Sequence, residues 1–515
     1  MMKYKNPILP GFHPDPSICR VGEDFYLVHS TFEFYPGVPV YHSRNLVNWD
    51  LTGYCLNRDS QVKLHQCAAS GGIYAPTLRY HEGTFYMCTT NVSDRGNFIV
   101  HTKDITGNWS EPVWVDQEGI DPSILFDEDG TVYFCTAVFT PGKEGIYMSE
   151  IDPDTGARLT EVQKITDGCG GRCAEGPHLY RFFGKYYLFL AEGGTEYGHL
   201  ETVLRAEHPY GPFEECPHNP LISHRNRLGD EIQCVGHADL TEDQNGNWWL
   251  VSLGVRTLSV NGSSVMLHNL GRETFLTPLT WDEQGWPMVE GAKTAIWMEG
   301  ILPGEIKETD WNFRDDFSGE YLHLRYAFLR NPDSSCYQLD QKHHELMLRG
   351  TELTLNDQDS PAFLGIRQWE FSIRAEVRFS VESMQEDGRI GITAFYNEDY
   401  HYEIYVMKRG GRYYICTAKK VHDIFAESEG MELKSIVFKG SEPEVPQDIT
   451  LRIMADRQVY SFYYVDREGK EWLCGKGMTA GLSTEQTWKM SFTGVFLGMF
   501  AEKGIGRMKW FSVEE

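Results

Sequence analysis

The sequence contains no apolar run of about 18 residues, the length needed for a membrane-spanning helix, so we expect no membrane partner. The beginning of the chain, MMKYKNPILPGFHP, lacks the apolar stretch of a secretory signal. The 12 cysteines are scattered, CGGRC (Cys169 to Cys173) does not have the CxxC spacing, and no zinc-type pairing recurs. We therefore expect mostly reduced thiols in a cytoplasmic protein.

The chain is also poor in basic residues relative to acidic ones. It has 47 Lys and Arg against 74 Asp and Glu, which gives a formal net charge of −27. Such a surface repels phosphate backbones, so nucleic acid is excluded as a partner and a small neutral or cationic molecule, or a neutral polymer, is favoured. The aromatic fraction of 13% and the 50 glycines favour a β-rich protein with many turns.

One pattern occurs five times in the first 300 or so residues. A polar or small residue, often beside proline, precedes apolar residues, a Gly-containing turn and an aromatic pair, which together predict a β-hairpin. The starts lie about 45 to 62 residues apart, the length of one four-stranded propeller blade. We therefore predict a five-bladed β-propeller over residues 1–303. The copies are DPSICRVGEDFYLV from Asp15, APTLRYHEGTFYMC from Ala75, DPSILFDEDGTVYF from Asp121, EGPHLYRFFGKYYLFL from Glu175 and GHADLTEDQNGNWWLV from Gly236.

The innermost strands of a propeller surround one central channel, so equivalent strand starts converge on one funnel. The equivalent positions are the Ala75-Pro76 stretch, three acids and a histidine: Asp15, Asp121, Glu175 and His237. Asp-Pro pairs are common turn formers, which would explain Asp15 alone. Turn chemistry does not explain three acids and a histidine at one rim, because carboxylates gathered in a recess oppose each other's ionisation.

Two carboxyl groups facing each other across a pocket suit glycoside hydrolysis, one protonated to donate to the leaving oxygen and one ionised. A third acid beside the proton donor raises the pKa of that donor. Asp121 and Glu175 come from consecutive blades and Asp15 from the first, which favours Asp121 as the modulator of Glu175 and Asp15 as the base opposite. Spacing alone does not fix these roles.

Eight stretches run in order from Asn6 to Leu276: NPILPGFHPDPSI, STFEFYPGVPVYHSRNLVNW, SGGIYAPTL, GIDPSILFD, AEGPHLY, AEGGTEYGH, GHADL and LGRETFL. Through these stretches the chain resembles glycoside hydrolase family 43, in particular its two-domain β-xylosidase and α-L-arabinofuranosidase branch. The resemblance implies a five-bladed propeller and an inverting mechanism with Asp15 as general base, Asp121 as pKa modulator and Glu175 as general acid. Glu192 in LFLAEGG is a rival acid that we rank below Glu175.

The same resemblance points to Phe32 as a pocket wall and to His237 and Arg272 as pocket residues. For Phe32 and His237 a plain place in the core is the alternative, and Arg272 would pair with Glu273 on a surface, clamp a sugar hydroxyl or hold Asp121 ionised. The family's β-xylosidases carry Trp in the GGIxAP stretch, whereas this chain has Tyr74, which leaves xylose and arabinose both open. We expect no required cofactor; in some relatives the histidine matching His237 faces an axial calcium, so calcium is left open.

After a linker near Leu302 to Thr309 the blade pattern stops. Short strands and hairpins, with turns at Asn397-Glu398-Asp399 and Gly410-Gly411, predict an antiparallel β-sandwich over residues 310–515. It resembles the concanavalin-like C-terminal domain of the same enzymes. In relatives a loop of that domain reaches over the pocket, and SFTGVFLGMF (Ser491 to Phe500) matches it, so Phe496 or a neighbour is expected either to close the site or only to pack.

We therefore expect an all-β exo-glycosidase that hydrolyses terminal β-D-xylose or α-L-arabinofuranose from xylan or arabinoxylan oligosaccharides. Two alternatives are kept. One is a retaining five-bladed glycosidase of the fructosidase type, although its NDPNG-type start is absent. The other is a carbohydrate-binding propeller without activity, which has little use for an acid of raised pKa. The expected partner is a small oligosaccharide, and a homo-oligomer is left open.

Overall fold

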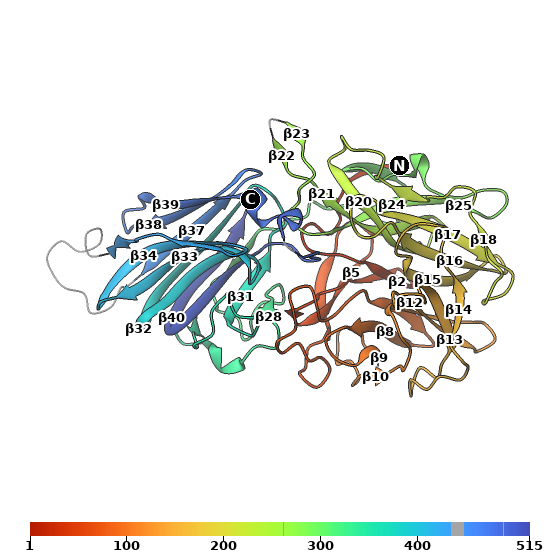
Figure 1. Cartoon of the computed structure of the whole chain (residues 1–515), viewed down its shortest axis with the longest axis horizontal. Helices are drawn as coiled ribbons and strands as arrows, with labels where there is room; N and C mark the ends of the chain where they lie inside the picture. The colour runs from red at the N-terminus through yellow and green to blue at the C-terminus, as the bar shows by residue number, and fades with distance from the viewer. Residues whose placement is uncertain (261, 434–447, 488) are drawn as a thin grey trace.

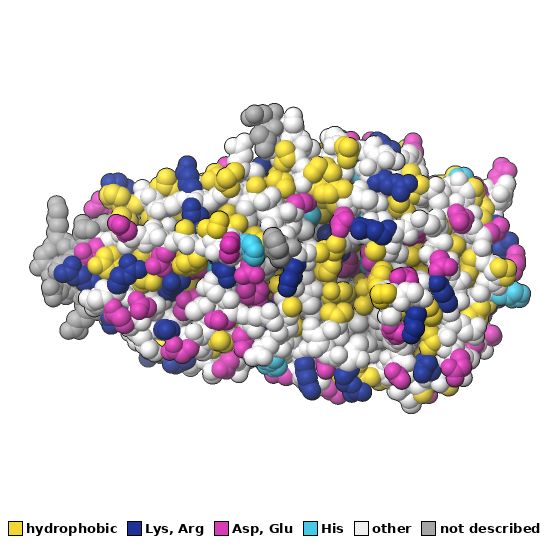
Figure 2. Space-filling view, viewed as in Figure 1, with side chains coloured by type: hydrophobic (Ala, Val, Ile, Leu, Met, Phe, Trp, Pro, Cys, Tyr) yellow, Lys and Arg dark blue, Asp and Glu magenta, His cyan; other side chains and the backbone are white. Residues whose placement is uncertain are grey.

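The computed structural model describes residues 1–260, 262–433, 448–487 and 489–515. Figure 1 shows two halves side by side, a propeller coloured red to green and a sandwich of long strands coloured cyan to blue. Charged side chains of both signs are spread over the face shown in Figure 2, with acidic ones on both halves. Within the described residues, no helix is long and apolar enough to cross a membrane.

The predicted five-bladed propeller is confirmed. Five sheets follow one another along the chain, each built on a path of four antiparallel strands. The blades consist of β2 (Ser17–Val21), β3 (Asp24–Val28), β5 (Gly37–Ser43) and β6 (Asp50–Leu56); β7 (Thr77–His81), β8 (Thr84–Asn91), β9 (Gly96–Thr102) and β10 (Val113–Trp114); β11 (Ile120–Phe126), β12 (Val132–Val138), β13 (Gly145–Glu150) and β14 (Gln163–Thr166); β15 (Glu175–Phe182), β16 (Lys185–Glu192), β17 (Leu200–Ala206) and β18 (Glu214–Glu215), with β19 (Ile222–Ser223) beside β17; and β20 (Ile232–Glu242), β21 (Trp248–Arg256), β24 (Glu273–Trp281) and β25 (Pro287–Met288).

The first hairpin of every blade is the repeated sequence pattern. Each hairpin turn places a glycine at positive φ, where an L side chain would be strained; examples are Gly22 at 66° and Gly184 at 75°. The apolar and aromatic residues of the strands then pack between neighbouring blades, as Phe134 does against Cys88 and Ile124. The local turn signal and the period-2 pattern together fix the blade.

The N-terminal segment closes the ring on the last blade. Strand β1 (Met2–Lys5) pairs antiparallel with β26 (Trp297–Gly300). The segment then follows β24, where Ile8 N–H donates to the Thr274 carbonyl at 2.9 Å and His13 N–H to that of Arg272 at 2.9 Å. The chain therefore reaches the first blade from a fixed position beside Arg272.

The segment between the two halves lies along the first blade. Asn45 donates to the Glu305 carbonyl at 2.7 Å, and Asn48 donates to the Lys307 carbonyl at 2.8 Å. No strand lies between β26 and β27 (Phe313–Asp315). The boundaries at 303 and 310 stay predictions.

The second half is the predicted β-sandwich with a concanavalin-like arrangement. The first part of β32 (Ile373–Asn397) pairs with β37 and its last part with β33, so this long strand joins both layers. The turns predicted at 397–399 and 410–411 separate β32, β33 and β34. The strands of this sheet are β27, β29 (Tyr337–Asp340), β30 (Glu345–Arg349), β31 (Ala362–Arg367), β32, β33 (Tyr400–Arg409), β34 (Arg412–Val421), β35 (Ile424–Glu427), β36 (Met431–Glu432), β37 (Ile449–Ala455), β38 (Val459–Val465), β39 (Glu471–Met478) and β40 (Phe496–Glu514).

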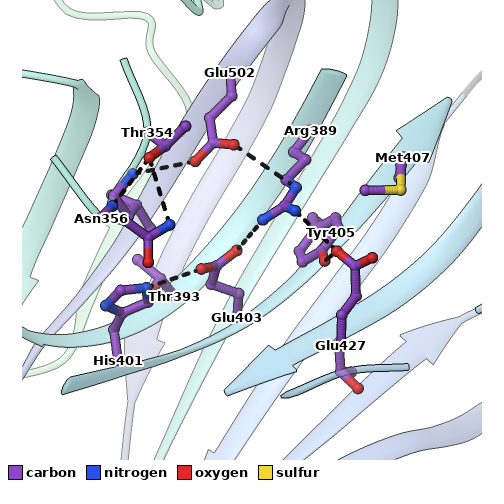
Figure 3. A network of polar contacts seen from close by, with 12 residues as sticks. Thr354, Asn356, Arg389, Thr393, His401, Glu403, Tyr405, Met407, Glu427 and Glu502 are labelled. Atoms are coloured by element: carbon purple, nitrogen blue, oxygen red, sulfur yellow. Dashed lines mark hydrogen bonds and ion pairs between the residues drawn. The ribbon is translucent and has the colours of Figure 1, made fainter. Parts of the chain in front are cut away.

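One face of the sandwich carries a buried polar network (Figure 3). Arg389 lies among three carboxylates, with its nitrogens 2.9 Å from Glu427 and 3.8 Å from Glu403 and from Glu502. Burial and the neighbouring Glu403 raise the pKa of Glu502 to about 7. Ionisation of Glu502 is therefore less favourable in the folded protein than in the unfolded chain.

Apolar clusters join the two halves. One joins Phe12 and Phe34 of the propeller to Phe496 and Phe500 of the sandwich, and a smaller one joins Leu258 and Leu270 to Phe371. Arg256 on β21 reaches across to Glu370 at 2.7 Å. The halves are therefore held together by both apolar and charged contacts, and segments from both meet at the propeller funnel.

Candidate active site

Asp15 lies at the start of the innermost strand of the first blade, with its carboxylate held from several sides. Arg272 donates from Nη1 to Oδ1 at 2.8 Å and from Nη2 to Oδ2 at 3.3 Å. The Ser30 hydroxyl donates to Oδ2, and His237 Nδ1 lies 3.8 Å from Oδ1. Only 3% of Asp15 is exposed. These contacts fix the orientation of a buried carboxylate.

Arg272 has a carboxylate partner that the sequence interpretation did not include, and it does not pair with Glu273; its contact with a sugar stays a prediction, and its charge does lower the pKa of Asp121. Its direct carboxylate partner is Asp15. The two side chains meet because the N-terminal strap, Pro10 to His13, leads to Asp15 and runs along the backbone of Arg272. Glu273 instead pairs with Arg256 at 2.8 Å and accepts from Gly11 N–H at 2.7 Å.

Asp121, Gly176 and His237 come from three further inner strands and lie close together. The Asp121 carboxylate accepts from the Gly176 N–H at 3.2 Å. Gly176 has φ +56°, and a Cβ there would lie 2.9 Å from His237 Nε2. Glycine is therefore required, because the backbone passes directly over the imidazole ring. The arrangement brings Asp121 beside Glu175, the residue before Gly176.

The electrostatics of the two carboxyl groups differ from those of exposed acids. Burial, the charge of Asp121 and that of Asp15 raise the pKa of Glu175 well above its ordinary value. The pKa of Asp121 is raised to about 6 by burial and by Asp15, against the lowering effect of His237. A carboxyl group that stays protonated near neutral pH therefore lies beside one that is ionised.

The same inner strands close the channel a few residues further along. Asp239 accepts from Arg79 at 2.9 Å and from the Ser17 hydroxyl at 2.6 Å. Arg79 also contacts His178 Nδ1 at 3.1 Å, and Tyr180 donates to Asp239. Burial opposes ionisation of Asp239, but Arg79, His178 and the hydrogen bonds from Ser17 and Tyr180 together outweigh it and lower the pKa of this acid. These charges, contributed by four blades, form a floor to the funnel.

One side of the site is aromatic and belongs to both halves of the molecule. The Phe32 ring lies 5.2 Å from Tyr74 and 5.5 Å from Phe492, and the Arg272 guanidinium lies 5.3 Å from the Phe492 ring. The Phe492 carbonyl accepts from Arg272 at 3.3 Å. Burial and the charge of Asp121 raise the pKa of Tyr74 to about 12, so its hydroxyl stays protonated.

Phe496, the residue first named for closing the site, lies elsewhere. It is fully buried and stacks on Phe34 with ring centroids 4.0 Å apart. Because β40 begins at Phe496 and pairs with β31 and β32, this side chain is held in the packing between the halves. Its neighbour Phe492 contacts Arg272 instead.

A pocket of about 360 Å³ opens beside Arg272, between the propeller and the sandwich. Glu485 holds its wall in place by accepting from His268 N–H at 3.0 Å and from Tyr197 OH at 2.8 Å. The lining residues are Thr195, Glu196, Tyr197, Cys234, His268 and Arg272 from the propeller and Thr484, Glu485, Thr487, Lys489, Met490 and Ser491 from the sandwich.

Two other candidates take structural positions. The rival acid Glu192 accepts from Cys169 N–H at 2.7 Å, from Gly171 N–H and from the Thr202 hydroxyl at 2.7 Å, so it holds a loop. Around His237, no group of three or more metal-binding side chains is found in the described part of the chain. Calcium takes six to eight oxygen ligands, waters among them, and Asp15, the acid beside His237, is engaged by Arg272. Calcium near His237 stays an untested prediction.

Sequence reasoning did not single out Ser30, Thr195 or Phe492. Thr195 shares Arg272 with Asp15, accepting from Nη1 at 3.1 Å. Ser30 and Thr195 lie within the stretches that carry the family resemblance, and Phe492 within the segment expected to reach the pocket. Small hydroxyl residues directly beside such a stretch were the available signal.

A five-bladed propeller with three acids near one another on its inner strands, one of them with a strongly raised pKa, is suited to glycoside hydrolysis. The sequence profile described as glycosyl hydrolases family 43 matches residues 4–287. A second profile, the β-xylosidase C-terminal concanavalin A-like domain, matches residues 314–513. The chain belongs to glycosyl hydrolase family 43, which confirms the resemblance. The two alternatives, a fructosidase-type glycosidase and a carbohydrate-binding propeller without activity, are not favoured.

Several relatives match nearly the whole chain. A non-reducing end α-L-arabinofuranosidase of Bacteroides ovatus is 40% identical over 506 residues, 97% of this chain and 91% of the relative. A β-xylosidase of Bacillus subtilis is 32% identical over 90% of this chain and 89% of its own. Among solved structures, the xylan β-1,4-xylosidase of Bacillus halodurans has a TM-score of 0.90 at 30% identity, covering 99% of this chain and all of that one.

Proposed function

We propose that this glycoside hydrolase removes single terminal pentoses, β-D-xylose or α-L-arabinofuranose, from short xylan or arabinoxylan oligosaccharides with inversion. The observation that carries the proposal is the group of three carboxyls, in which Glu175 has a strongly raised pKa and Asp15 is held by Arg272 and Ser30. In an inverting hydrolase one carboxylate activates water while an acid protonates the leaving oxygen.

Each acid then has one task. Asp15, fixed by its contacts, removes a proton from the attacking water. Glu175 gives its proton to the leaving oxygen, which its raised pKa makes available at neutral pH. Asp121 supplies the negative charge that keeps Glu175 protonated, and it orients the backbone at Gly176.

The shape of the site supports action at a chain end. The floor formed by Arg79 and Asp239 lies further along the inner strands, so a long chain cannot pass through the propeller. The aromatic side formed by Phe32, Tyr74 and Phe492 disfavours the hydroxymethyl group of a hexose. The pocket beside Arg272 is suited to the rest of the oligosaccharide.

The choice between the two pentoses rests on Tyr74 in this proposal. Its hydroxyl can donate a hydrogen bond that a tryptophan cannot make in the same place. Relatives named as arabinofuranosidases and as xylosidases both match the chain. We therefore expect activity on both sugars, with the ratio sensitive to Tyr74→Trp.

Rates on nitrophenyl β-D-xyloside, α-L-arabinofuranoside and β-D-glucoside test the proposal. We expect turnover of at least one pentoside and at least about tenfold slower turnover of the glucoside, a step of 1.4 kcal/mol. Asp15→Ala should remove turnover of every substrate without unfolding the protein, which circular dichroism checks. Glucoside turnover equal to that of both pentosides would refute the proposed substrate.

Early-time NMR of the released sugar tests the stereochemistry. Inversion predicts a first product with the anomeric configuration opposite to that of the substrate. A first product that keeps the configuration of the substrate would show that one carboxylate attacks the sugar directly.

We also propose a cytoplasmic location. All twelve cysteines are free thiols, which suits a reducing compartment. Cell fractionation with thiol labelling tests this, and disulfide-bonded protein in the culture medium would contradict it. A homo-oligomer stays a prediction, which light scattering would decide.

A further inference from the structure

A second and larger cavity lies away from the catalytic acids, where the propeller, the connecting segment and the sandwich meet. Its volume is about 960 Å³, within the range of sites that bind small molecules. The strap Pro10 to His13, which leads to Asp15, forms part of its wall. The residues at its inner end, which the argument uses, are His13, Tyr41, Trp311, Arg325, Arg367 and Trp369.

Two arginines line this cavity without a carboxylate partner. Arg367 is only 6% exposed and donates from Nε to the Phe12 carbonyl at 2.9 Å. Arg325 donates to the Trp311 carbonyl at 2.8 Å, and its guanidinium lies 4.9 Å from the Trp369 ring. Neither makes an ion pair within the part of the chain that the structure describes. Carbonyls and rings accept their hydrogens, but no anion neutralises their charge.

The two cations also repel each other. Burial and the charge of Arg367 lower the pKa of Arg325 to about 10, against the opposing effect of Tyr41. Burial, His29 and the same Arg367, in decreasing order of effect, lower the pKa of His13 well below its ordinary value, so this imidazole is neutral. An inner wall with two uncompensated positive charges is costly in a protein with a net charge of −27.

Acidic residues of the cavity lie at its solvent-exposed edge. Asp50, Glu305, Glu308 and Asp310 all line it and are all exposed. Of these, Asp310 favours the charged form of Arg325, but at a distance too long for an ion pair. The positive charge is therefore concentrated at the inner end, where a ligand would be most shielded from water.

We propose that this cavity binds a small oxyanion, and that the natural ligand is the carboxylate of a sugar acid. Guanidinium groups bind carboxylate and phosphate through paired hydrogen bonds. The volume favours the sugar acid over free phosphate, because an inorganic anion would leave most of the cavity empty. The half-buried ring of Trp311 offers a flat apolar contact to a sugar ring, while the buried Trp369 holds Arg325 in place from behind.

Calorimetric titration of the full-length protein with sodium D-glucuronate tests the proposal, with D-glucose as the neutral probe and inorganic phosphate as the small oxyanion. We expect glucuronate to bind at least about tenfold more tightly than glucose and to lose affinity as salt is raised. Trp311 and Trp369 should report the binding through a change in tryptophan fluorescence. Binding of phosphate without glucuronate would overturn the sugar-acid assignment, and equal binding of glucose would overturn the oxyanion site.

Arg325→Gln should weaken glucuronate binding by at least about tenfold, because one of the two cations is removed. The matched control is Arg44→Gln, since Arg44 lines the same cavity but is exposed and already paired with Asp24 at 2.8 Å. If Arg325→Gln does not fold, Arg325→Lys keeps the charge, loses the planar fork and should bind with intermediate affinity. Unchanged glucuronate binding in the Arg325 variant would place the ligand elsewhere. Pentosidase rates are read separately, so a failure here leaves the proposed function intact.

Discussion

Replacing Asp121 by asparagine should move the pH profile of the enzyme. The Asn side chain still offers an oxygen to the Gly176 N–H but carries no charge. In the wild type, the charge of Asp121 is the largest cause after burial of the raised pKa of Glu175. The variant therefore isolates the electrostatic task of Asp121 from its place in the backbone.

The size of the effect follows from Coulomb's law. Asp121 accepts a hydrogen bond from Gly176, the residue next to Glu175, so the two carboxyls are on the order of 6 Å apart. At an effective dielectric constant of about 20, they interact by about 3 kcal/mol. One pKa unit corresponds to 1.36 kcal/mol, which gives about two units at most. The pKa of Asp121 is itself about 6, so this carboxyl is only partly ionised near that pH. We therefore expect the alkaline limb of the pH profile to move by about 1.5 pH units.

The sign is determined by which form of Glu175 works. A general acid must be protonated, so activity falls as the pH rises through its pKa. Removing the charge of Asp121 lowers that pKa, and the alkaline limb of kcat/KM should move to lower pH. The assay is kcat/KM against pH on xylobiose or an arabinose-substituted oligosaccharide, whose leaving groups need protonation. An alkaline limb that stays in place, or moves to higher pH, would refute the electrostatic role.

Three further outcomes are expected. Glu175→Ala should lose far more activity on oligosaccharides than on nitrophenyl glycosides, because good leaving groups need little protonation; equal losses would contradict its role as acid. Phe492→Ala should raise KM and lower kcat by roughly tenfold together, since the ring contacts both Phe32 and Arg272, and a wild-type rate would show that the sandwich does not shape the site. In the wild type, the raised folded-state pKa of Glu502 makes its ionisation unfavourable, so stability falls between about pH 4.5 and 7, and Glu502→Gln should remove this fall. Thermal unfolding at pH 5 and 8 checks this, and an unchanged pH slope would contradict it.

The propeller could be predicted because its signals are local. A hairpin with a glycine turn depends on residues next to one another in the chain, and the five copies then fix the blade order. The positions of Asp15, Asp121 and Glu175 follow from that order alone, since inner strands converge on one channel. The same reasoning placed the turns at 397–399 and 410–411.

Contacts between the two halves were beyond such reasoning. The carbonyl of Phe492 reaches Arg272 across 220 positions of sequence, and no periodic pattern reports a contact of that kind. The sequence interpretation offered Arg272 three other partners and did not include Asp15. The strap that brings Asp15 to Arg272 joins the first residues of the chain to the last blade, and no local sequence signal shows such a contact. The sequence pointed to Phe496 or a neighbour and could not tell Phe496 from Phe492, since the start of β40 is set by its pairing with β31.

The position of Phe492 has a consequence for the order in which a newly made chain becomes active. The ribosome releases all five blades, with Asp15, Asp121 and Glu175 in place, before it synthesises Phe492. That residue is held only once β40 has joined β31 and β32, which come earlier in the chain. A propeller without the final strand therefore carries its three acids but lacks the finished aromatic side, and we expect it to hydrolyse substrate more slowly than the full chain.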